Sequence, residues 1–250
     1  MTHDLVSLAE SHSAKNRQRS LTPKFIYFDL DDTLLDHKRA EAAALNDVHT
    51  RFDIFEDIKA QKLIDIYGTV NRKQWELYSK GEVSRKQMQR NRFELTLEKL
   101  KLDTSGYADI GTFYMRCYRD YWHWISGARE AFAAISRKFE VGILTNGFSE
   151  TQKLKFKQFD LYGRVSHLVI SEEVGVLKPH PRVFQHATEL TGHNAGEILY
   201  IGDSFSSDIL GASQFGWKTA WYTKEALPEE ENKADFVFSD FKELYRYLSI

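Results

Sequence analysis

The amino-acid sequence predicts an α/β protein in which a parallel-sheet core carries an inserted, all-helical domain. Short apolar runs rich in β-branched and aromatic residues alternate with helical patterns, which is typical of strands buried on both faces of a parallel sheet. One long interval, 37–125, breaks this alternation and contains only helical patterns. The expected architecture is therefore a Rossmann-like, doubly wound core with a helical cap domain.

Six segments are predicted to be strands: 25–30, 139–145, 167–173, 198–203, 218–223 and 235–240. Four helical patterns follow residue 126: 127–138, 149–160, 181–191 and 206–215. Because strand and helix alternate, we expect the strands to run parallel and the helices to cover the sheet.

The inserted interval contains long helical patterns over 37–52, 57–80, 83–101 and 107–124. Residues 23–36 and 126–250 are predicted to form the core, residues 37–125 the cap, and residues 1–22 a flexible tail. The expected hinges lie near Asp36 and Ser126. Ligands of open α/β sheets bind at the carboxyl ends of the strands, so a domain inserted there is expected to cover the site.

Composition excludes several classes of protein. The formal net charge of −2 over 250 residues argues against a dedicated nucleic-acid binder, which is usually basic. A single cysteine, Cys117, excludes an intrachain disulfide. No apolar stretch approaches the roughly 18 residues of a membrane span, and residues 1–22 lack the apolar centre of a secretory signal. We expect a cytoplasmic monomer or homodimer without a membrane or nucleic-acid partner.

The first predicted strand ends in a group of aspartates, in the stretch FIYFDLDDTLLD (25–36). Residues two apart in an extended chain point to the same side, so Asp29 and Asp31 are expected to face one point. Two carboxylates so close are unfavourable unless a cation joins them or one is protonated, and we expect them to titrate as a pair. The alternative is a strand followed by an acidic turn, with Asp32 only as a capping residue.

A second acidic strand end occurs in ILYIGDSFSSD (198–208). Asp203 follows a buried strand directly, Asp208 lies five residues later, and Ser206 or Ser207 is the expected N-cap of the next helix. Carboxylate oxygens with a backbone carbonyl suit a hard cation such as Mg²⁺, and no Cys/His cluster offers a zinc site. The alternative is that both aspartates only form a turn and a cap.

Two further segments carry residues suited to an anion. GILTNGFSETQ (142–152) places Thr145 and Asn146 between a strand and a helix, where a hydroxyl, an amide and free N–H groups can bind an anion. VGVLKPHPRVF (174–184) places Lys178 between residues stiffened by proline. Each segment alone is a weak signal, because Thr-Asn-Gly is a common turn and most lysines are solvated. Beside acidic strand ends, Lys178 is expected to point inward.

Together, these segments resemble the four motifs of the haloacid dehalogenase (HAD) superfamily of phosphatases. The matching residues, in order, are Asp29, Asp31 and Thr33 for the first motif, Thr145 for the second, Lys178 for the third, and Gly202, Asp203 and Asp208 for the fourth. A helical insertion between the first two motifs resembles the subfamily with a helical cap. Within it, TNGFSETQ and YSKGEVSRKQMQRNRF resemble the house-cleaning pyrimidine 5′-nucleotidases.

The resemblance implies a Mg²⁺-dependent phosphomonoester hydrolase that forms a phosphoaspartate. It implies that Asp29 attacks phosphorus and that Asp31 is the general acid and base. The dehalogenase branch lacks an acid at this second position, so Asp31 favours phosphoryl transfer. Asp29, the main-chain carbonyl of Asp31 and Asp203 would hold Mg²⁺.

The remaining motif residues would hold the phosphate or support the site. Lys178, Thr145 and Asn146 would bind the phosphate oxygens. Asp208 would hold Lys178 or a metal-bound water, and Thr33 would order the first motif.

The implied substrate is a nucleoside 5′-monophosphate or a similar small phosphorylated metabolite. The alternatives are a sugar-phosphate phosphatase, of the N-acylneuraminate-9-phosphate or phosphoglycolate type, and a phosphomutase. A receiver domain also gathers aspartates, a Thr/Ser and a lysine around Mg²⁺, but it needs about half this length. A non-catalytic scaffold is disfavoured by the complete motif set.

The cap is expected to supply selectivity. Its aromatic residues include Tyr67, Trp75, Tyr78, Phe93, Tyr118, Trp122 and Trp124, most of which are expected to pack between helices. Arg85, Lys86, Arg90 and Arg92 are expected to form a solvated basic face.

Overall fold

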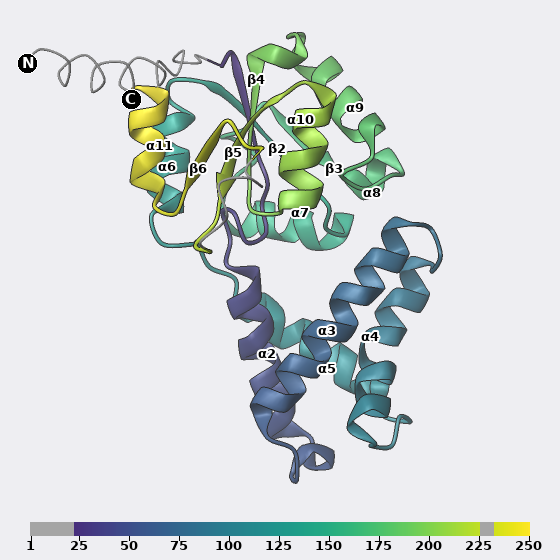
Figure 1. Cartoon of the computed structure of the whole chain (residues 1–250). Coiled ribbons are helices and arrows are strands. Elements are labelled where there is room, and N and C mark those ends of the chain that lie inside the picture. The colour runs from purple at the N-terminus through teal and green to yellow at the C-terminus, as the bar shows by residue number, and fades with distance from the viewer. Residues whose placement is uncertain (1–22, 226–232) are drawn as a thin grey trace, which may run out of the picture.

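The computed structural model describes residues 23–225 and 233–250. Its core is a six-stranded parallel sheet in the order β3-β2-β1-β4-β5-β6 (Figure 1). The strands are β1 (Phe25–Phe28), β2 (Glu140–Thr145), β3 (His167–Ile170), β4 (Ile198–Gly202), β5 (Lys218–Tyr222) and β6 (Phe236–Phe238). The predicted α/β class and the six predicted strands are confirmed. The predicted tail over 1–22 lies outside the described residues.

The first strand lies in the middle of the sheet. Phe28 of β1 is in register with Ile143 of β2 on one side and with Ile201 of β4 on the other. The chain leaves β1 towards β2 and β3, and later returns to build β4, β5 and β6 on the opposite side. The carboxyl ends of β1 and β4 therefore meet at the topological switch point, where open α/β sheets bind ligands.

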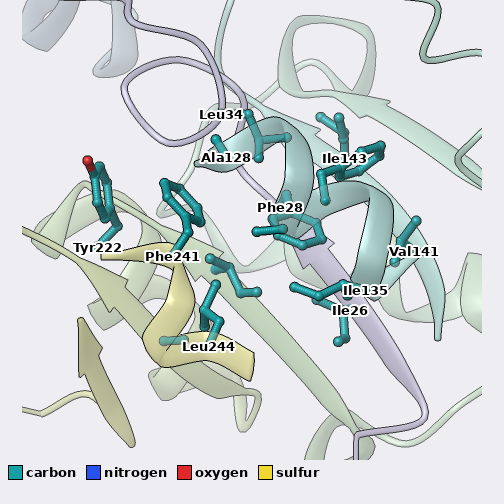
Figure 2. Close-up of a cluster of buried hydrophobic side chains, with 14 of the residues drawn as sticks. Ile26, Phe28, Leu34, Ala128, Ile135, Val141, Ile143, Tyr222, Phe241 and Leu244 are labelled. Atoms are coloured by element: carbon teal, nitrogen blue, oxygen red, sulfur yellow. The ribbon is translucent and has the colours of Figure 1, made fainter. Parts of the chain in front are cut away.

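One face of the sheet is covered by α6 (Ala128–Ile135) and α11 (Phe241–Leu248), which pack on Ile26 and Phe28 of β1 (Figure 2). These two residues point the same way because side chains alternate along a strand. The resulting hydrophobic cluster anchors β1 to the helices on this face of the sheet.

The other face is covered by α9 (Pro181–Thr191) and α10 (Gly211–Phe215), which pack on Phe25 and Tyr27. Gly142 of β2 permits this packing, since a Cβ there would lie 2.5 Å from the Tyr27 ring. The core therefore has helices on both faces of its sheet, as the alternating pattern predicts.

Three boundaries differ from the predictions. The predicted strand 167–173 ends at Ile170, because residues 171–174 form the short helix α8 (Ser171–Val174), which Gly175 ends with φ +81°. The helix predicted over 206–215 begins as a π-helical turn, η3 (Phe205–Leu210), and continues as α10. Its N-cap is Ser204, which accepts from the Ser207 N–H at 3.4 Å, and not Ser206 or Ser207.

The interval after β1 is helical. It contains α2 (His37–Arg51), the short helix η1 (Asp53–Phe55), α3 (Ala60–Ser79), α4 (Arg85–Leu100) and α5 (Tyr107–Asp120). These helices form a separate body beyond the carboxyl edge of the sheet (Figure 1) and have a hydrophobic cluster of their own. We call this body the cap. In the described part of the chain, no helix combines the length and the apolar character needed to span a bilayer.

Two neighbouring linkers join the cap to the core. The Asp36 N–H donates to the His123 carbonyl at 3.0 Å, and the Ile125 N–H donates to the Leu34 carbonyl at 2.9 Å. The linkers lie where the sequence predicts hinges. The exact domain boundaries, the cytoplasmic location and the monomeric or dimeric state stay predictions.

Candidate active site

A cavity of about 580 Å³ lies between the cap and the carboxyl edge of the sheet. Seven of the eight predicted site residues line it: Asp29, Asp31, Thr145, Asn146, Lys178, Asp203 and Asp208. The eighth, Thr33, is buried behind the lining, and its hydroxyl donates to Asp203 Oδ1 at 3.3 Å. The structure therefore brings together residues that lie as far apart in the sequence as Asp29 and Asp208.

Lys178 is almost completely buried and points into the acidic strand ends. Its Nζ lies 2.7 Å from Asp29 Oδ1 and 2.8 Å from Asp208 Oδ1. It also donates to the Tyr200 hydroxyl at 2.5 Å and to the Leu144 carbonyl at 3.1 Å. Burial acts to lower the pKa of Lys178, but Asp208 and Asp29 outweigh it and raise that pKa. The lysine stays charged, pointing inward as expected.

Three carboxylates form a possible cation site. Asp29, Asp203 and Asp208 can each offer one oxygen, with these atoms within 4.8 Å of one another. Burial raises the pKa of Asp29 well above its ordinary value, although Lys178 opposes this. Burial and the neighbouring Asp208 raise the pKa of Asp203 to about 7. The site therefore carries more negative charge than its one lysine can offset, and its oxygen donors fit a hard dication such as Mg²⁺.

Asp31 has a different set of partners from Asp29. Lys155 Nζ of α7 (Ser149–Gln158) lies 2.5 Å from Asp31 Oδ1, and Gln152 Nε2 lies 2.9 Å from Asp31 Oδ2. Burial acts to raise the pKa of Asp31, but Lys155 and His37 outweigh it, so the pKa is lowered. The carboxylate is therefore held in its ionised form.

The expectation that Asp29 and Asp31 titrate as a pair stays a prediction, although the two carboxylates have different lysine partners. The carboxylates that raise the pKa of Asp29 are Asp208 and Asp203, whereas Asp31 is paired with Lys155. Two residues that are adjacent on one side of the chain thus have opposite pKa shifts. The sequence reasoning identified Lys178, the partner of Asp29, but not Lys155, the partner of Asp31.

The Asn146 side chain also holds the loop that carries Lys178, and its expected role as a donor to an anion stays a prediction. Its Nδ2 donates to the Lys178 carbonyl at 3.0 Å, and its Oδ1 accepts from the Lys178 N–H at 2.8 Å. The amide group therefore fixes the loop that carries Lys178, and the second Nδ2 hydrogen is left for an anion. Thr145 Oγ1 accepts from Gln152 Nε2 at 2.8 Å, which leaves its hydroxyl proton to donate.

Lys155 and Gln152 are site residues that the sequence reasoning missed. Both are buried, and they lie three residues apart on the face of α7 that also buries Phe156. Polar residues on an otherwise apolar helix face were the available signal. Lys153 and Lys157 stand two residues to either side, so composition alone could not select Lys155.

Few of the cap aromatics reach the cavity. Trp75 and Tyr118 line it, together with Tyr114, which the sequence reasoning did not single out. Tyr67, Phe93 and Trp122 pack in the cap cluster, as expected. Trp124 packs against the cluster of the core.

The expectation of a solvated basic face is wrong for two of its four residues. Arg92 is buried and lines the cavity. Arg85 crosses to the core, where its guanidinium pairs with Glu150 and, at 3.2 Å, with Glu172. The other two, Lys86 and Arg90, are exposed as expected.

Comparison with known proteins identifies the family of this chain. The model of the haloacid dehalogenase-like hydrolases matches residues 23–216, which include every predicted site residue. The chain belongs to this family. As a HAD hydrolase, it shares both its fold and its enzyme class with the relatives described next.

Three relatives of this HAD hydrolase match nearly end to end. It is 30% identical over 227 residues to the pyrimidine 5′-nucleotidase YjjG of Escherichia coli (strain K12), covering 90% of this chain and 97% of YjjG. It is 29% identical over 229 residues to the HAD-hydrolase YfnB of Bacillus subtilis (strain 168), covering 90% and 95%. It is 30% identical over 236 residues to a glyceraldehyde 3-phosphate phosphatase of Pyrococcus furiosus, covering 90% and 92%.

A solved structure agrees with the sequence comparison. The crystal structure of YfnB, described as bound to magnesium, superposes with a TM-score of 0.77 at 28% identity, over 91% of this chain and 99% of YfnB. The L-2-haloacid dehalogenase of Xanthobacter autotrophicus superposes with a TM-score of 0.71 at 18% identity, over 91% and 98%, which shows the shared fold alone.

Proposed function

We propose that this HAD hydrolase is a Mg²⁺-dependent phosphomonoesterase that works through a phosphoaspartate on Asp29. The observation that carries the proposal is the division of Asp29 and Asp31 between two lysines in one cavity. Because each carboxyl group has its own lysine partner, the two groups can take different tasks in one reaction. We assign the nucleophile to Asp29 and proton transfer to Asp31.

Asp29 is the nucleophile in this proposal. Lys178 holds its Oδ1 at 2.7 Å, which fixes the carboxylate for attack on phosphorus as the ester bond breaks. A Mg²⁺ ion held by Asp29, Asp203 and the Asp31 carbonyl would supply the positive charge that keeps the nucleophile ionised and offsets the phosphate. Lys178 and the Thr145 hydroxyl would stabilise the phosphate oxygens.

Asp31 is the proton carrier in this proposal. Its low pKa leaves it ionised in the free enzyme, and the negative charge of an arriving phosphate favours its protonation. Protonated Asp31 would give its proton to the leaving alcohol oxygen. The carboxylate would then take a proton from the water that attacks the phosphoaspartate, which restores both aspartates.

We propose a nucleoside 5′-monophosphate as the substrate, in the pyrimidine series. The naming of YjjG and of PynA from Streptococcus pneumoniae as pyrimidine 5′-nucleotidases supports this, as does a cavity of about 580 Å³ that includes the ring of Trp75. The 30% identity to a glyceraldehyde 3-phosphate phosphatase favours a sugar phosphate as the second candidate.

The test is a substrate panel on the purified full-length protein with Mg²⁺. It compares nucleoside 5′-monophosphates with glyceraldehyde 3-phosphate, phosphoglycolate and N-acylneuraminate 9-phosphate. Preference for pyrimidine nucleotides supports the proposal. Hydrolysis of none of them contradicts it.

The mechanism is tested by Asp29→Asn, which removes the nucleophile but keeps the shape of the side chain. We expect turnover to fall by at least about a thousandfold with an unchanged circular dichroism spectrum. The matched control is Asp32→Asn, whose carboxylate accepts from the Lys38 N–H at 2.9 Å and which should keep most of the activity. Activity of Asp29→Asn within about tenfold of wild type would remove the assignment.

A further inference from the structure

The ammonium group of Lys155 joins the core to the cap. The residue belongs to α7 of the core and is 1% exposed. Its Nζ lies 2.5 Å from Asp31 Oδ1 and 3.0 Å from the hydroxyl of Tyr118, on cap helix α5. It also lies 5.2 Å from the centre of the Trp122 ring, just past the same helix. One lysine thus contacts both bodies and the proposed proton carrier.

The burial of this lysine needs an explanation beyond packing. Burying a charge is strongly unfavourable unless the charge is paired, and an apolar side chain would fill the same space without that penalty. Lys153 and Lys157, two residues away on either side, are both exposed. In residues 23–225 and 233–250, Asp31 is the one carboxylate that pairs with Lys155. The buried charge therefore serves Asp31.

The cap fixes the other side of the ammonium group. Because Lys155 donates to the Tyr118 oxygen, the Tyr118 proton is free to point at Nδ1 of His37, 2.7 Å away on cap helix α2. The other ring nitrogen of His37, Nε2, faces Glu41 at 3.7 Å. The orientation of Lys155 therefore depends on side chains from two cap helices.

Both oxygens of Asp31 are held. Lys155 binds Oδ1, and Gln152 binds Oδ2 at 2.9 Å, so the carboxylate cannot turn freely about its axis. Each carboxylate oxygen has a second lone pair, which remains for a substrate atom. The two donors thus fix the direction of Asp31 without blocking it.

We propose that Lys155 is a positioning residue for Asp31, and that Tyr118 of the cap holds Lys155 in place. The inference rests on the proposed function, in which Asp31 protonates the leaving oxygen. Asp31 faces the leaving oxygen only while the cap contacts the core through Tyr118 and Lys155. Proton transfer therefore requires this contact between cap and core.

This role predicts a dependence on the leaving group. As the bond from phosphorus to the ester oxygen breaks and the bond to Asp29 forms, the proton of Asp31 moves to the ester oxygen. An alkoxide needs that proton, whereas p-nitrophenolate is stable without it. A badly aimed Asp31 therefore slows alkyl phosphate esters more than p-nitrophenyl phosphate. A general loss of structure slows both alike.

The experiment compares kcat/KM, which reports the first chemical step, for p-nitrophenyl phosphate and for the alkyl phosphomonoester that wild type hydrolyses best. For Lys155→Met we expect a loss of at least about a hundredfold on the alkyl ester and less than about tenfold on p-nitrophenyl phosphate. Lys155→Arg should recover most of the loss. Tyr118→Phe should act in the same direction by a smaller factor.

Several outcomes separate this inference from its alternatives. Equal losses on both substrates, or no loss on either, would overturn it. Lys157→Met, an exposed lysine on the same helix, is the control and should match wild type. If Lys155→Met does not fold, the Arg and Tyr118→Phe variants decide. Failure of wild type to hydrolyse either ester overturns the proposed function itself. Normal wild-type activity with an unchanged substrate ratio in the variants overturns this inference alone.

Discussion

At the residue scale, the site consists of two carboxylates with two separate lysines. Lys178 reaches Asp29 from the loop before α9, and Lys155 reaches Asp31 from α7. Asp203 has no ion pair with a lysine or arginine in the described part of the chain, and burial and the neighbouring Asp208 raise its pKa to about 7. We therefore expect the charge state of Asp203 to change near neutral pH.

This shift makes the stability of the metal-free protein depend on pH. The native state holds the Asp203 proton more tightly than the unfolded chain, whose pKa is near 3.8. Between that value and about 7, the free energy of unfolding therefore falls as pH rises. In EDTA, urea titrations should give a lower free energy of unfolding at pH 8 than at pH 5, by at most about 3 kcal/mol from this group.

Asp203→Asn is the matched variant for this measurement. The variant should show a smaller difference in the free energy of unfolding between pH 5 and pH 8. Part of the difference should remain, because the pKa of Asp29 is also raised. Adding Mg²⁺ at pH 8 should stabilise wild type more than the variant. A metal-free wild type that is as stable at pH 8 as at pH 5 contradicts the assignment.

The sequence predicted the side chains at strand ends well, because parallel strands bring their carboxyl ends to one edge. Asp29 and Asp203 follow from that rule alone. Lys155 does not, since its place depends on the rotation of α7 about its axis and on contact with the cap. Asn146 was correctly placed, but its amide group is used by the backbone of Lys178.

At the element scale, the start of α4 contacts the core at the edge of the cavity. Arg85 pairs with Glu150 and Glu172 and lies 4.5 Å above the ring of Phe148. Trp75 of α3 stacks on the same ring at 5.0 Å. Phe148 precedes α7, so this contact holds the cap against the helix that carries Lys155.

We expect Arg85→Ala to weaken cap closure and to raise KM by about fivefold, with kcat little changed. Partly exposed ion pairs and a cation–π contact together contribute about 1 kcal/mol, which corresponds to that factor. Steady-state kinetics at low and high salt check the effect, because salt should raise the KM of wild type more than that of the variant.

Arg90→Ala is the control for this prediction. Arg90 lies on the same helix, but its partner at 2.6 Å is Glu94, also on α4, so it does not bridge cap and core. Its KM should match wild type. An equal rise in KM for both variants would point to damage to α4 and not to a lost contact with the core.

The sequence also predicted most elements, but it was less accurate for short ones. The cap helices follow strong helical patterns and appear within a few residues of their predicted limits. The helix α8 has only four residues, too few to establish a helical period, and the sequence pattern predicts the end of a strand there. The last helix, α11, follows the predicted strand 235–240 directly and was not predicted.

At the scale of the whole molecule, the cap and the core each have their own hydrophobic cluster, and the site lies between them. The predicted catalytic residues belong to the core, whereas α2, α3, α4 and α5 line the other side of the cavity. Substrate size should therefore be limited by the space that the cap leaves.

We expect a nucleoside 5′-monophosphate to be hydrolysed and a 5′-phosphorylated oligonucleotide to be excluded. The two share the reacting ester, but the oligonucleotide cannot fit in a cavity of about 580 Å³ with the cap in place. Phosphate release should give a kcat/KM at least about a hundredfold lower for the oligonucleotide. Equal values would contradict a selective cap.

The linkers at Leu34–Asp36 and His123–Ile125 have a consequence for how such enzymes diversify. The polypeptide leaves the core and re-enters it through these two linkers, which are hydrogen-bonded to each other. Any insert whose ends lie side by side could be grafted there without disturbing the acidic edge. Exchange of the cap can therefore change the specificity while the residues of the core stay in place. The contact that would be lost is the hydrogen bond between Tyr118 of the cap and Lys155.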